Sequence, residues 1–189
     1  SKENLFSGLN NPTVNTVLDE KYSEYFGFTG EEVDAMAAYY GRSDKLGEIR
    51  TWYDGYRFGN SEVYCPWDVI NYCKEHLSNP SVAPKNYWMN TSGNDVINHF
   101  IDSMDQKGQL TKSELETLVN GGTIQKEICE ELTYRELYST IDNLWSTLFM
   151  TGYLTSRGTP DGSLYELAIP NREVRNIIIS RILTRFKED

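Results

Sequence analysis

The sequence predicts a mostly α-helical fold with a small amount of β-structure. Three observations support this fold class: apolar residues recur at helical spacing along much of the chain, capping signals precede several of these stretches, and one block combines aromatic residues with turn glycines. We expect residues 1–122 to form a helical, lid-like bundle with a β-hairpin inserted near 53–65. Residues 123–189 are expected to form a winged-helix-like module.

Capping residues mark the helices of the bundle. Thr29 and Glu32 have the spacing of a capping box and predict a helix that ends before Gly41. Pro66 predicts the start of another helix, because a proline in the first turn loses no hydrogen bond. A further helix is expected from Asn94, since five apolar residues recur there at helical spacing: Val96, Ile97, Phe100, Ile101 and Met104.

The block 49–72 is the most distinctive part of the chain. It contains seven aromatic residues, two glycines and a proline in 24 positions. Asp54-Gly55 is a strong turn signal, because glycine tolerates a positive φ and aspartate can hydrogen-bond to the backbone ahead of it. We expect a hairpin held between helices, in which the following residues are structural: Trp52, Tyr53, Asp54, Gly55, Tyr56, Phe58, Gly59, Pro66 and Trp67.

The C-terminal third changes character. The pattern predicts, in order, a strand over 123–128, a short helix capped by Thr133 and Glu136, a helix over 141–151, two strands around a turn at 158–162, and a last helix capped by Asn171. This order of elements is typical of a winged-helix module.

The helix over 141–151 is the element that would contact DNA in such a module. Its apolar stripe includes Leu144, Trp145 and Leu148, and we expect Asp142, Asn143, Ser146 and Thr147 to be exposed. These exposed positions include no lysine or arginine, although a DNA-reading helix needs cations near the phosphates. The sequence therefore favours a winged helix that packs against protein.

The net charge of the chain also disfavours binding to nucleic acid. The net charge is −10, which opposes non-specific attraction to nucleic-acid phosphates. The last helix nevertheless carries four arginines that form a candidate nucleic-acid face: Arg172, Arg175, Arg181 and Arg185. The alternative for these arginines is an ordinary solvated helix face, since cations are favoured near a helix C-terminus.

Compartment and metal chemistry follow from the remaining composition. The three cysteines are scattered, which indicates a reducing compartment, and Cys73 with His76 does not make a zinc site without a second pair of ligands. No apolar run approaches the ~20 residues that span a bilayer, and no signal peptide is visible. We expect a cytoplasmic protein without a membrane partner.

Several blocks of this chain, in this order, resemble the bacterial AAA-ATPase-like family: Ser7–Asn11, Tyr25–Val33, Asp54–Gly59, Val63–Tyr72, Tyr87–Ser92, Asp142–Trp145, Gly152–Thr155 and Ile169–Arg175. Members of that family have an N-terminal P-loop ATPase core, then a region like this one, and often a C-terminal PD-(D/E)XK nuclease domain. The resemblance covers nearly the whole chain. It implies that the chain is the region after the ATPase core, with those two domains as its partners.

The catalytic motifs of both neighbouring domains are missing from this sequence. No Gly-x-x-x-x-Gly-Lys-Ser/Thr is present to hold a nucleotide phosphate. Pro160-Asp161 is better interpreted as a turn than as a nuclease acid, because Glu166-Leu167-Ala168 lacks the lysine that should follow. We therefore expect no enzyme activity, catalytic residue, metal or cofactor in this chain alone, with ATP and magnesium bound by the parent protein.

The functional prediction is a non-catalytic lid and winged-helix segment of an AAA-ATPase-like protein, which couples the nucleotide state to neighbouring domains. The alternative is a nucleic-acid-binding winged-helix module of a nuclease-associated ATPase. Arg57 is the candidate nucleotide sensor that would reach a phosphate across the lid. The alternative for Arg57 is local: stacking on Tyr56 or Trp52, or pairing with Asp54.

Overall fold

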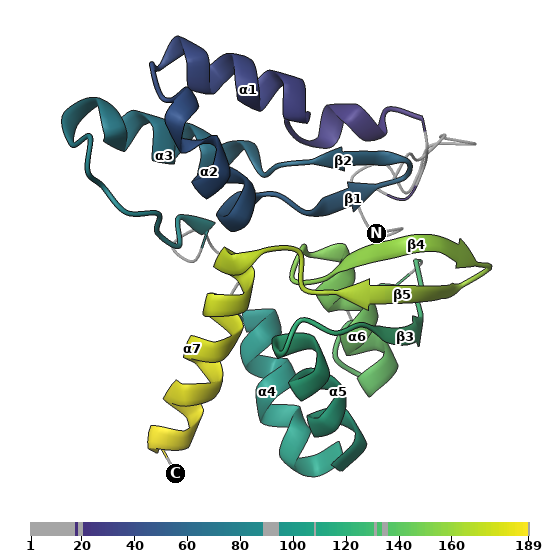
Figure 1. Cartoon of the computed structure of the whole chain (residues 1–189). Helices are drawn as coiled ribbons and strands as arrows, with labels where there is room; N and C mark the ends of the chain where they lie inside the picture. Colours follow the sequence, from purple (N-terminus) through teal and green to yellow (C-terminus); the bar gives the residue numbers. More distant parts are fainter. Residues whose placement is uncertain are drawn as a thin grey trace. The chain divides into compact units, whose positions relative to one another are not determined.

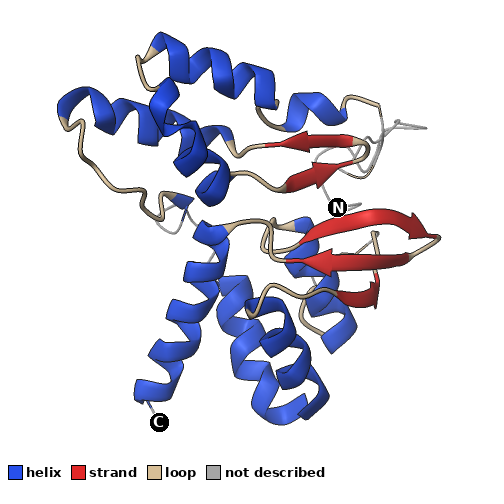
Figure 2. Ribbon diagram, in the orientation of Figure 1, coloured by secondary structure: helices blue, strands red, loops and turns tan. Residues whose placement is uncertain are grey.

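The structure, a computed structural model, describes residues 18, 21–88, 95–107, 109–130, 132–133 and 136–188. Helices make up most of these residues, and the strands form two small antiparallel sheets (Figure 1, Figure 2). The prediction of a mostly α-helical chain with small β-structure is confirmed. The described residues divide into a hairpin unit, within 18–88 and 170–180, and a sheet unit, within 95–169 and 181–188.

This division differs from the predicted boundary between residues 122 and 123. The helices α4 (Asp95–Lys107) and α5 (Gln109–Val119) belong to the sheet unit, because they contact α6 (Ile141–Met150) and β3 (Ile124–Glu127), respectively. The helix α7 (Arg172–Glu188) begins in the hairpin unit and ends in the sheet unit. Packing partners, which the local pattern does not contain, therefore decide which unit an element joins.

The hairpin unit is built from short helices around one β-hairpin (Figure 1). The capping box of its first long helix is confirmed: Thr29 Oγ1 accepts from the Glu32 N–H, and Glu32 Oε2 accepts from the Thr29 N–H at 2.9 Å. Its elements are η1 (Ser23–Phe26), α1 (Gly30–Tyr39), η2 (Ser43–Lys45), α2 (Leu46–Tyr53), β1 (Tyr56–Phe58), β2 (Ser61–Val63) and α3 (Pro66–Ser78).

The hairpin lies within the predicted range, and the Asp54-Gly55 turn comes before its first strand. The strands β1 and β2 pair antiparallel from Tyr56↔Val63 to Phe58↔Ser61, so the chain reverses at Gly59-Asn60. Asp54-Gly55 instead joins α2 to β1, with Asp54 Oδ1 accepting from the Gly55 N–H at 2.7 Å. Local turn chemistry therefore identified the turn that separates α2 from the hairpin.

Three helices supply the core of the hairpin unit. Its buried residues come from α1, α2 and α3 and from the end of the hairpin, and aromatic rings fill much of the space between them. The core comprises Val33, Ala37, Ile49, Tyr53, Tyr64, Val69, Tyr72 and Cys73.

The sheet unit contains a three-stranded antiparallel sheet in the order β3-β5-β4. The strand β4 spans Thr155–Asp161 and β5 spans Leu164–Ala168. The predicted turn at 158–162 is therefore wrong for most of its length, because β4 continues through it with an irregular register between Arg157 and Asp161. The chain reverses at Gly162-Ser163, where Gly162 has a φ of 61°.

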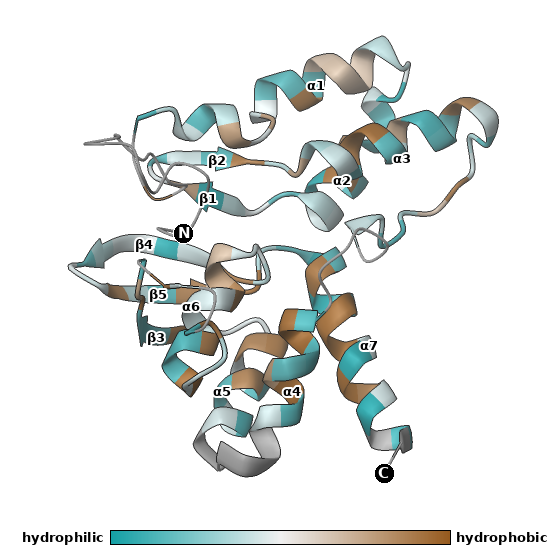
Figure 3. Cartoon of the chain, turned by 180° about the vertical axis from the view of Figure 1, so that it is seen from behind, coloured by the Kyte–Doolittle hydropathy of each residue, from teal (hydrophilic) through white to brown (hydrophobic). Residues whose placement is uncertain are grey.

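Helix α6 lies in the core of the sheet unit. Trp145 is completely buried and packs edge-on against Phe100 of α4. Hydrophobic positions, brown in Figure 3, run along α4 between hydrophilic ones, which is the pattern of a helix with one buried side.

Two of the predicted exposed positions of α6 are buried. Ser146 is 0% exposed and Thr147 is 2% exposed. Ser146 Oγ accepts from the Cys129 N–H at 3.0 Å. The Thr147 hydroxyl donates to the Asn143 carbonyl at 2.7 Å and also lies 3.2 Å from the Leu137 carbonyl. The loop that precedes α6 therefore covers this side, and a small hydroxyl can be buried because it finds a backbone partner.

That loop also corrects a helix prediction. Glu136 Oε2 accepts from the Thr133 N–H at 3.0 Å and from its hydroxyl at 2.7 Å, as in a capping box. Residues 136–139 nevertheless form turns and no helix. Across the helices of the described ranges, none combines the length and the apolar character needed to cross a bilayer.

Candidate functional site

Two carboxyl groups are buried together in the hairpin unit. Asp68 lies in the first turn of α3 and Glu173 in the first turn of α7, and each side chain is 1% exposed. Carboxylates are almost never buried to this extent without a compensating partner. We call these two residues the acid pair.

The two helix starts are fixed by ordinary local signals. Pro66 occupies the first turn of α3 and follows Cys65. Asn171 caps α7, with its Oδ1 accepting from the Val174 N–H at 3.0 Å. Acidic residues in a first helical turn are favoured by the helix dipole, so each carboxyl sits where its own helix stabilises negative charge.

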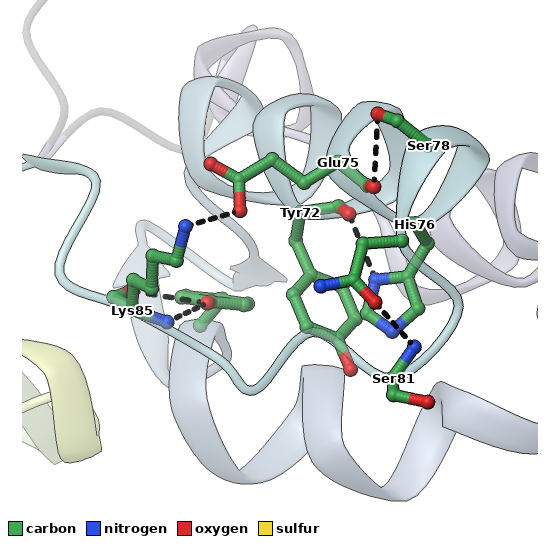
Figure 4. A network of polar contacts seen from close by, with 8 residues as sticks. Tyr72, Glu75, His76, Ser78, Ser81 and Lys85 are labelled. Atoms are coloured by element: carbon green, nitrogen blue, oxygen red, sulfur yellow. Dashed lines mark hydrogen bonds and ion pairs between the residues drawn. The ribbon is translucent and has the colours of Figure 1, made fainter.

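A third segment completes the surroundings of the acid pair. The Trp88 N–H donates to Glu173 Oε1 at 2.8 Å. The chain before Trp88 is held on α3 by Lys85, whose Nζ lies 2.6 Å from Glu75 Oε2, as Figure 4 shows. The buried Tyr53 hydroxyl adds two bonds at 3.1 Å, one to the carbonyl of Lys85 and one from its N–H.

The acid pair must hold a proton. Asp68 Oδ1 and Glu173 Oε2 are buried and have no hydrogen-bond partner among the described residues, and each carboxyl group acts on the pKa of the other. Two neighbouring carboxyl groups that are buried in this way cannot both be ionised without strong repulsion, so one of them keeps its proton. Burial, followed by the charge of Asp68, raises the pKa of Glu173 to about 9, and burial also raises the pKa of Asp68.

Cys65 contributes a further proton to this cluster. Burial, together with the nearby charge of Asp68, raises the pKa of the Cys65 thiol to about 12. The thiol therefore stays neutral near pH 7, and it is a possible donor to the neighbouring Asp68 carboxyl group. A neutral donor of this kind suits a pair that carries one negative charge.

The acid pair is a closed contact with limited chemistry. Both side chains are almost completely buried, so they meet each other and the backbone of Trp88 in place of a substrate. What such a pair can do is hold or release one proton and join α3 to the start of α7. Sequence reasoning missed it, because acids in first turns are usually solvated and nothing local shows that two helix starts meet.

Several of the residues predicted to be structural are buried or contact the start of α7. Gly55 has a φ of 105°, and a Cβ added there would lie 2.1 Å from the Pro170 carbonyl oxygen. Tyr53 is completely buried and Tyr56 nearly so, and the Arg172 guanidinium lies 5.1 Å from the centre of the Trp52 ring. Trp67 differs, because it is 53% exposed at the start of α3.

Arg57 lies on β1 and makes a local contact. Its Nε donates to the Gly59 carbonyl at 3.4 Å. The Trp52 ring, which was one expected partner, is contacted by Arg172. A nucleotide-sensing role for Arg57 stays a prediction.

The four arginines predicted as a nucleic-acid face are divided between the two units. Arg172 and Arg175 belong to the hairpin unit, whereas Arg181 and Arg185 belong to the sheet unit. Arg172 covers Trp52, and Arg185 Nε lies 3.3 Å from Asp102 Oδ1. Arg172 and Arg185 therefore have protein partners within their own units.

Possible metal ligands are dispersed in the described part of the chain, where no three histidine, cysteine, aspartate or glutamate side chains gather into a metal-binding group. His76 is 1% exposed, and its Nδ1 lies 3.0 Å from the Tyr72 carbonyl one turn earlier in α3. The block Ser7–Asn11 and the end of the block Tyr87–Ser92 lie outside the described residues.

The chain is similar to a protein of Azotobacter chroococcum mcd 1 described as "Uncharacterized protein in vnfD 5'region". The two are 26% identical over 189 residues, which is 98% of this chain and 33% of the relative. The chain thus spans about a third of the length of the curated relative that it matches. No family model matches the chain, and no solved structure does.

Proposed function

We propose that this chain is a non-catalytic segment of an AAA-ATPase-like protein, in which the helical hairpin unit acts as a lid that couples nucleotide state to neighbouring domains. The observation that carries the proposal is the acid pair. Side chains that would serve catalysis if exposed are buried here and join α3, the segment that ends at Trp88 and the start of α7. Such a joint suits an element that moves as a body.

The location of the acid pair within the family resemblance supports the same role. Asp68, Trp88 and Glu173 come from three of the blocks that resemble the AAA-ATPase-like family, and Gly55 of a fourth block packs against the Pro170 carbonyl. The match to one third of a longer relative agrees with a segment that acts beside other domains. In the parent, the partners would be a P-loop ATPase core that binds ATP and magnesium, and a nuclease domain.

The sheet unit is proposed to be the winged-helix part of this segment. Its strand order β3-β5-β4, with α6 between β3 and β4, is the order expected for a helix followed by a two-stranded wing. The burial of Ser146 and Thr147 supports a packing role for α6, because a helix that reads DNA must present a free side to the major groove.

Nucleic-acid binding is the less supported alternative. The net charge of −10 opposes it, and the partners found for Arg172 and Arg185 remove cations from the proposed phosphate-binding face. The sheet unit would need another basic surface to bind a duplex.

The proposal is tested first on the coding frame and the isolated chain. The reading frame upstream of Ser1 should encode a P-loop, and the isolated chain should show no micromolar affinity for Mg-ATP in calorimetry. Micromolar affinity in the isolated chain, or a complete upstream frame without a P-loop, would contradict the lid assignment.

The second test uses the full-length protein. Glu173→Gln should change its ATP turnover or nucleotide affinity, because the amide replaces a proton that the acid pair can release with a donor that cannot titrate. Glu75→Gln is the matched control, since Glu75 lies on the surface of α3 and pairs with Lys85 at 2.6 Å. Equal and unchanged turnover in both variants would show that the joint does not report nucleotide state.

A further inference from the structure

The sheet unit contains a pocket that the proposed lid function does not use. It lies between α4 and the C-terminal half of α7 and has a volume of about 220 Å³. Polar and charged side chains dominate its lining: Asn98, Ile101, Asp102, Arg181, Thr184 and Arg185. A pocket of this size accommodates a small molecule, since one water occupies roughly 30 Å³ of liquid.

The two arginines of the pocket differ in their partners. Arg185 Nε lies 3.3 Å from Asp102 Oδ1, so this pair is close to neutral. Arg181 forms no ion pair with any described residue, and its Nε is buried without a hydrogen-bond partner among them. The lining therefore carries one positive charge that no carboxylate of the pocket balances.

The residues around Arg181 do not supply that balance. Tyr153 is 3% exposed, and burial raises its pKa to about 12 in spite of the nearby charge of Arg181. The phenol therefore stays neutral. The negative charge of Asp95 also raises the pKa of Tyr153, and Asp95 is an exposed residue at the start of α4. A guanidinium atom buried without an acceptor is costly, and an oxyanion is the partner that its geometry suits best.

We propose that this pocket binds the oxyanion group of a small molecule, a phosphate or a carboxylate, with Arg181 as its principal donor. The Asn98 amide can donate a second hydrogen bond from α4. Asp102 competes with the ligand for Arg185, so the bound anion and Asp102 share the positive charge of the two arginines. All residues of the pocket belong to the sheet unit, so this proposal does not depend on the lid function proposed for the hairpin unit.

Binding is measured on the whole chain by amide chemical-shift titration with three probes: inorganic phosphate, phenyl phosphate and benzoate. Sodium chloride keeps the ionic strength constant, because screening alone shifts surface resonances. The shifts should saturate and should centre on 98–102 and 181–185. Comparison of phosphate with benzoate decides which oxyanion is preferred, and phenyl phosphate shows whether the pocket also holds an attached ring.

Three variants separate a site from general electrostatics. Arg181→Gln should weaken binding by about tenfold or more, which corresponds to the loss of a charge-assisted hydrogen bond. Arg175→Gln removes the same charge from an exposed position of the same helix and should leave the affinity unchanged. Asp102→Asn should tighten binding, because it releases Arg185 from its competing partner.

Two results would overturn the proposal. One is a titration of the unmodified chain in which none of the probes gives saturable shifts at the pocket. The other is an equal loss of affinity in Arg175→Gln and Arg181→Gln, which would assign the binding to net charge. The titration of the unmodified chain needs no variant, so the proposal can be tested even if a variant does not fold.

Discussion

Gly55 is the residue of the hairpin unit at which an added methyl group should lower the unfolding free energy most. Its φ of 105° is unfavourable for other residues, and an added Cβ would lie 2.1 Å from the Pro170 carbonyl oxygen. We expect Gly55→Ala to cost about 3 kcal/mol or more of unfolding free energy, because strain and a backbone clash add. Urea unfolding followed by circular dichroism measures the loss.

Gly41 is the control for this substitution. It also has a positive φ, 65°, but a Cβ there meets nothing within 4 Å. Gly41→Ala should cost only ~1–2 kcal/mol, the usual penalty of a left-handed conformation. Equal losses of unfolding free energy at the two positions would mean that the close approach of Gly55 to Pro170 does not contribute to the cost of Gly55→Ala.

Trp145 and Trp67 should respond very differently to truncation. Trp145 is completely buried in the sheet unit, so Trp145→Ala should cost about 3–5 kcal/mol, the range for removing a large aromatic side chain from a core. Trp67 is 53% exposed, and Trp67→Ala should cost under ~1 kcal/mol. Thermal unfolding of both variants tests this order, which would be refuted by a larger loss at Trp67.

At the scale of elements, the acid pair makes the contact between α3 and α7 depend on pH. The pKa of Glu173 is about 9 in the folded chain, against 4.5 for an unperturbed glutamate. Between these values the folded pair keeps a proton that the unfolded carboxyls have released. The unfolding free energy should therefore fall as the pH rises from 4.5 toward 9.

Glu173→Gln should remove most of this slope, since its amide donates to Asp68 without titrating. Glu75→Gln should keep the wild-type slope, because Lys85 lowers the pKa of Glu75 and its titration lies below this window. Urea unfolding at a series of pH values gives the three curves. A wild-type curve that is level or rises across the window would exclude a shared proton.

The elements also show what the sequence could predict. Signals that act within one turn located three helix starts: the capping box of Thr29 and Glu32, Pro66, and the Asn171 cap all lie where they were expected. The same kind of signal failed at Thr133 and Glu136, whose bonds form without a following helix at 136–139. Predictions of which side of a helix is exposed were less reliable. Ser146 and Thr147 are small polar residues that look exposed, and they are buried because the loop with Cys129 and Leu137 covers them while backbone groups satisfy their hydroxyls.

The acid pair could not be predicted for a related reason. Asp68 and Glu173 each suit the first turn of their own helix, so the sequence explains both residues without any contact between them. That contact exists only because the starts of α3 and α7 meet in the hairpin unit. The hairpin block was recognised from its own residues, whereas its partners Trp88 and Pro170 come from distant parts of the chain.

At the scale of the whole molecule, the charge distribution predicts weak binding to DNA. The net charge is −10, and Arg172 and Arg185 are engaged with Trp52 and Asp102. Affinity for duplex DNA should be ~10⁻⁴ M or weaker near physiological salt, the level of non-specific binding. Fluorescence anisotropy over a salt series measures it, and sub-micromolar binding that weakens steeply with salt would restore the nucleic-acid alternative.

The burial of Trp145 allows the two units to be distinguished by their intrinsic tryptophan fluorescence. The sequence has four tryptophans, and Trp52, Trp67 and Trp88 fall in the hairpin unit, so Trp145 is the only indole between 95 and 188. Its emission should be blue-shifted and protected from acrylamide, whereas the half-exposed Trp67 should emit to the red and be quenched readily. Fluorescence from one unlabelled sample can therefore show whether the two units melt together or one after the other.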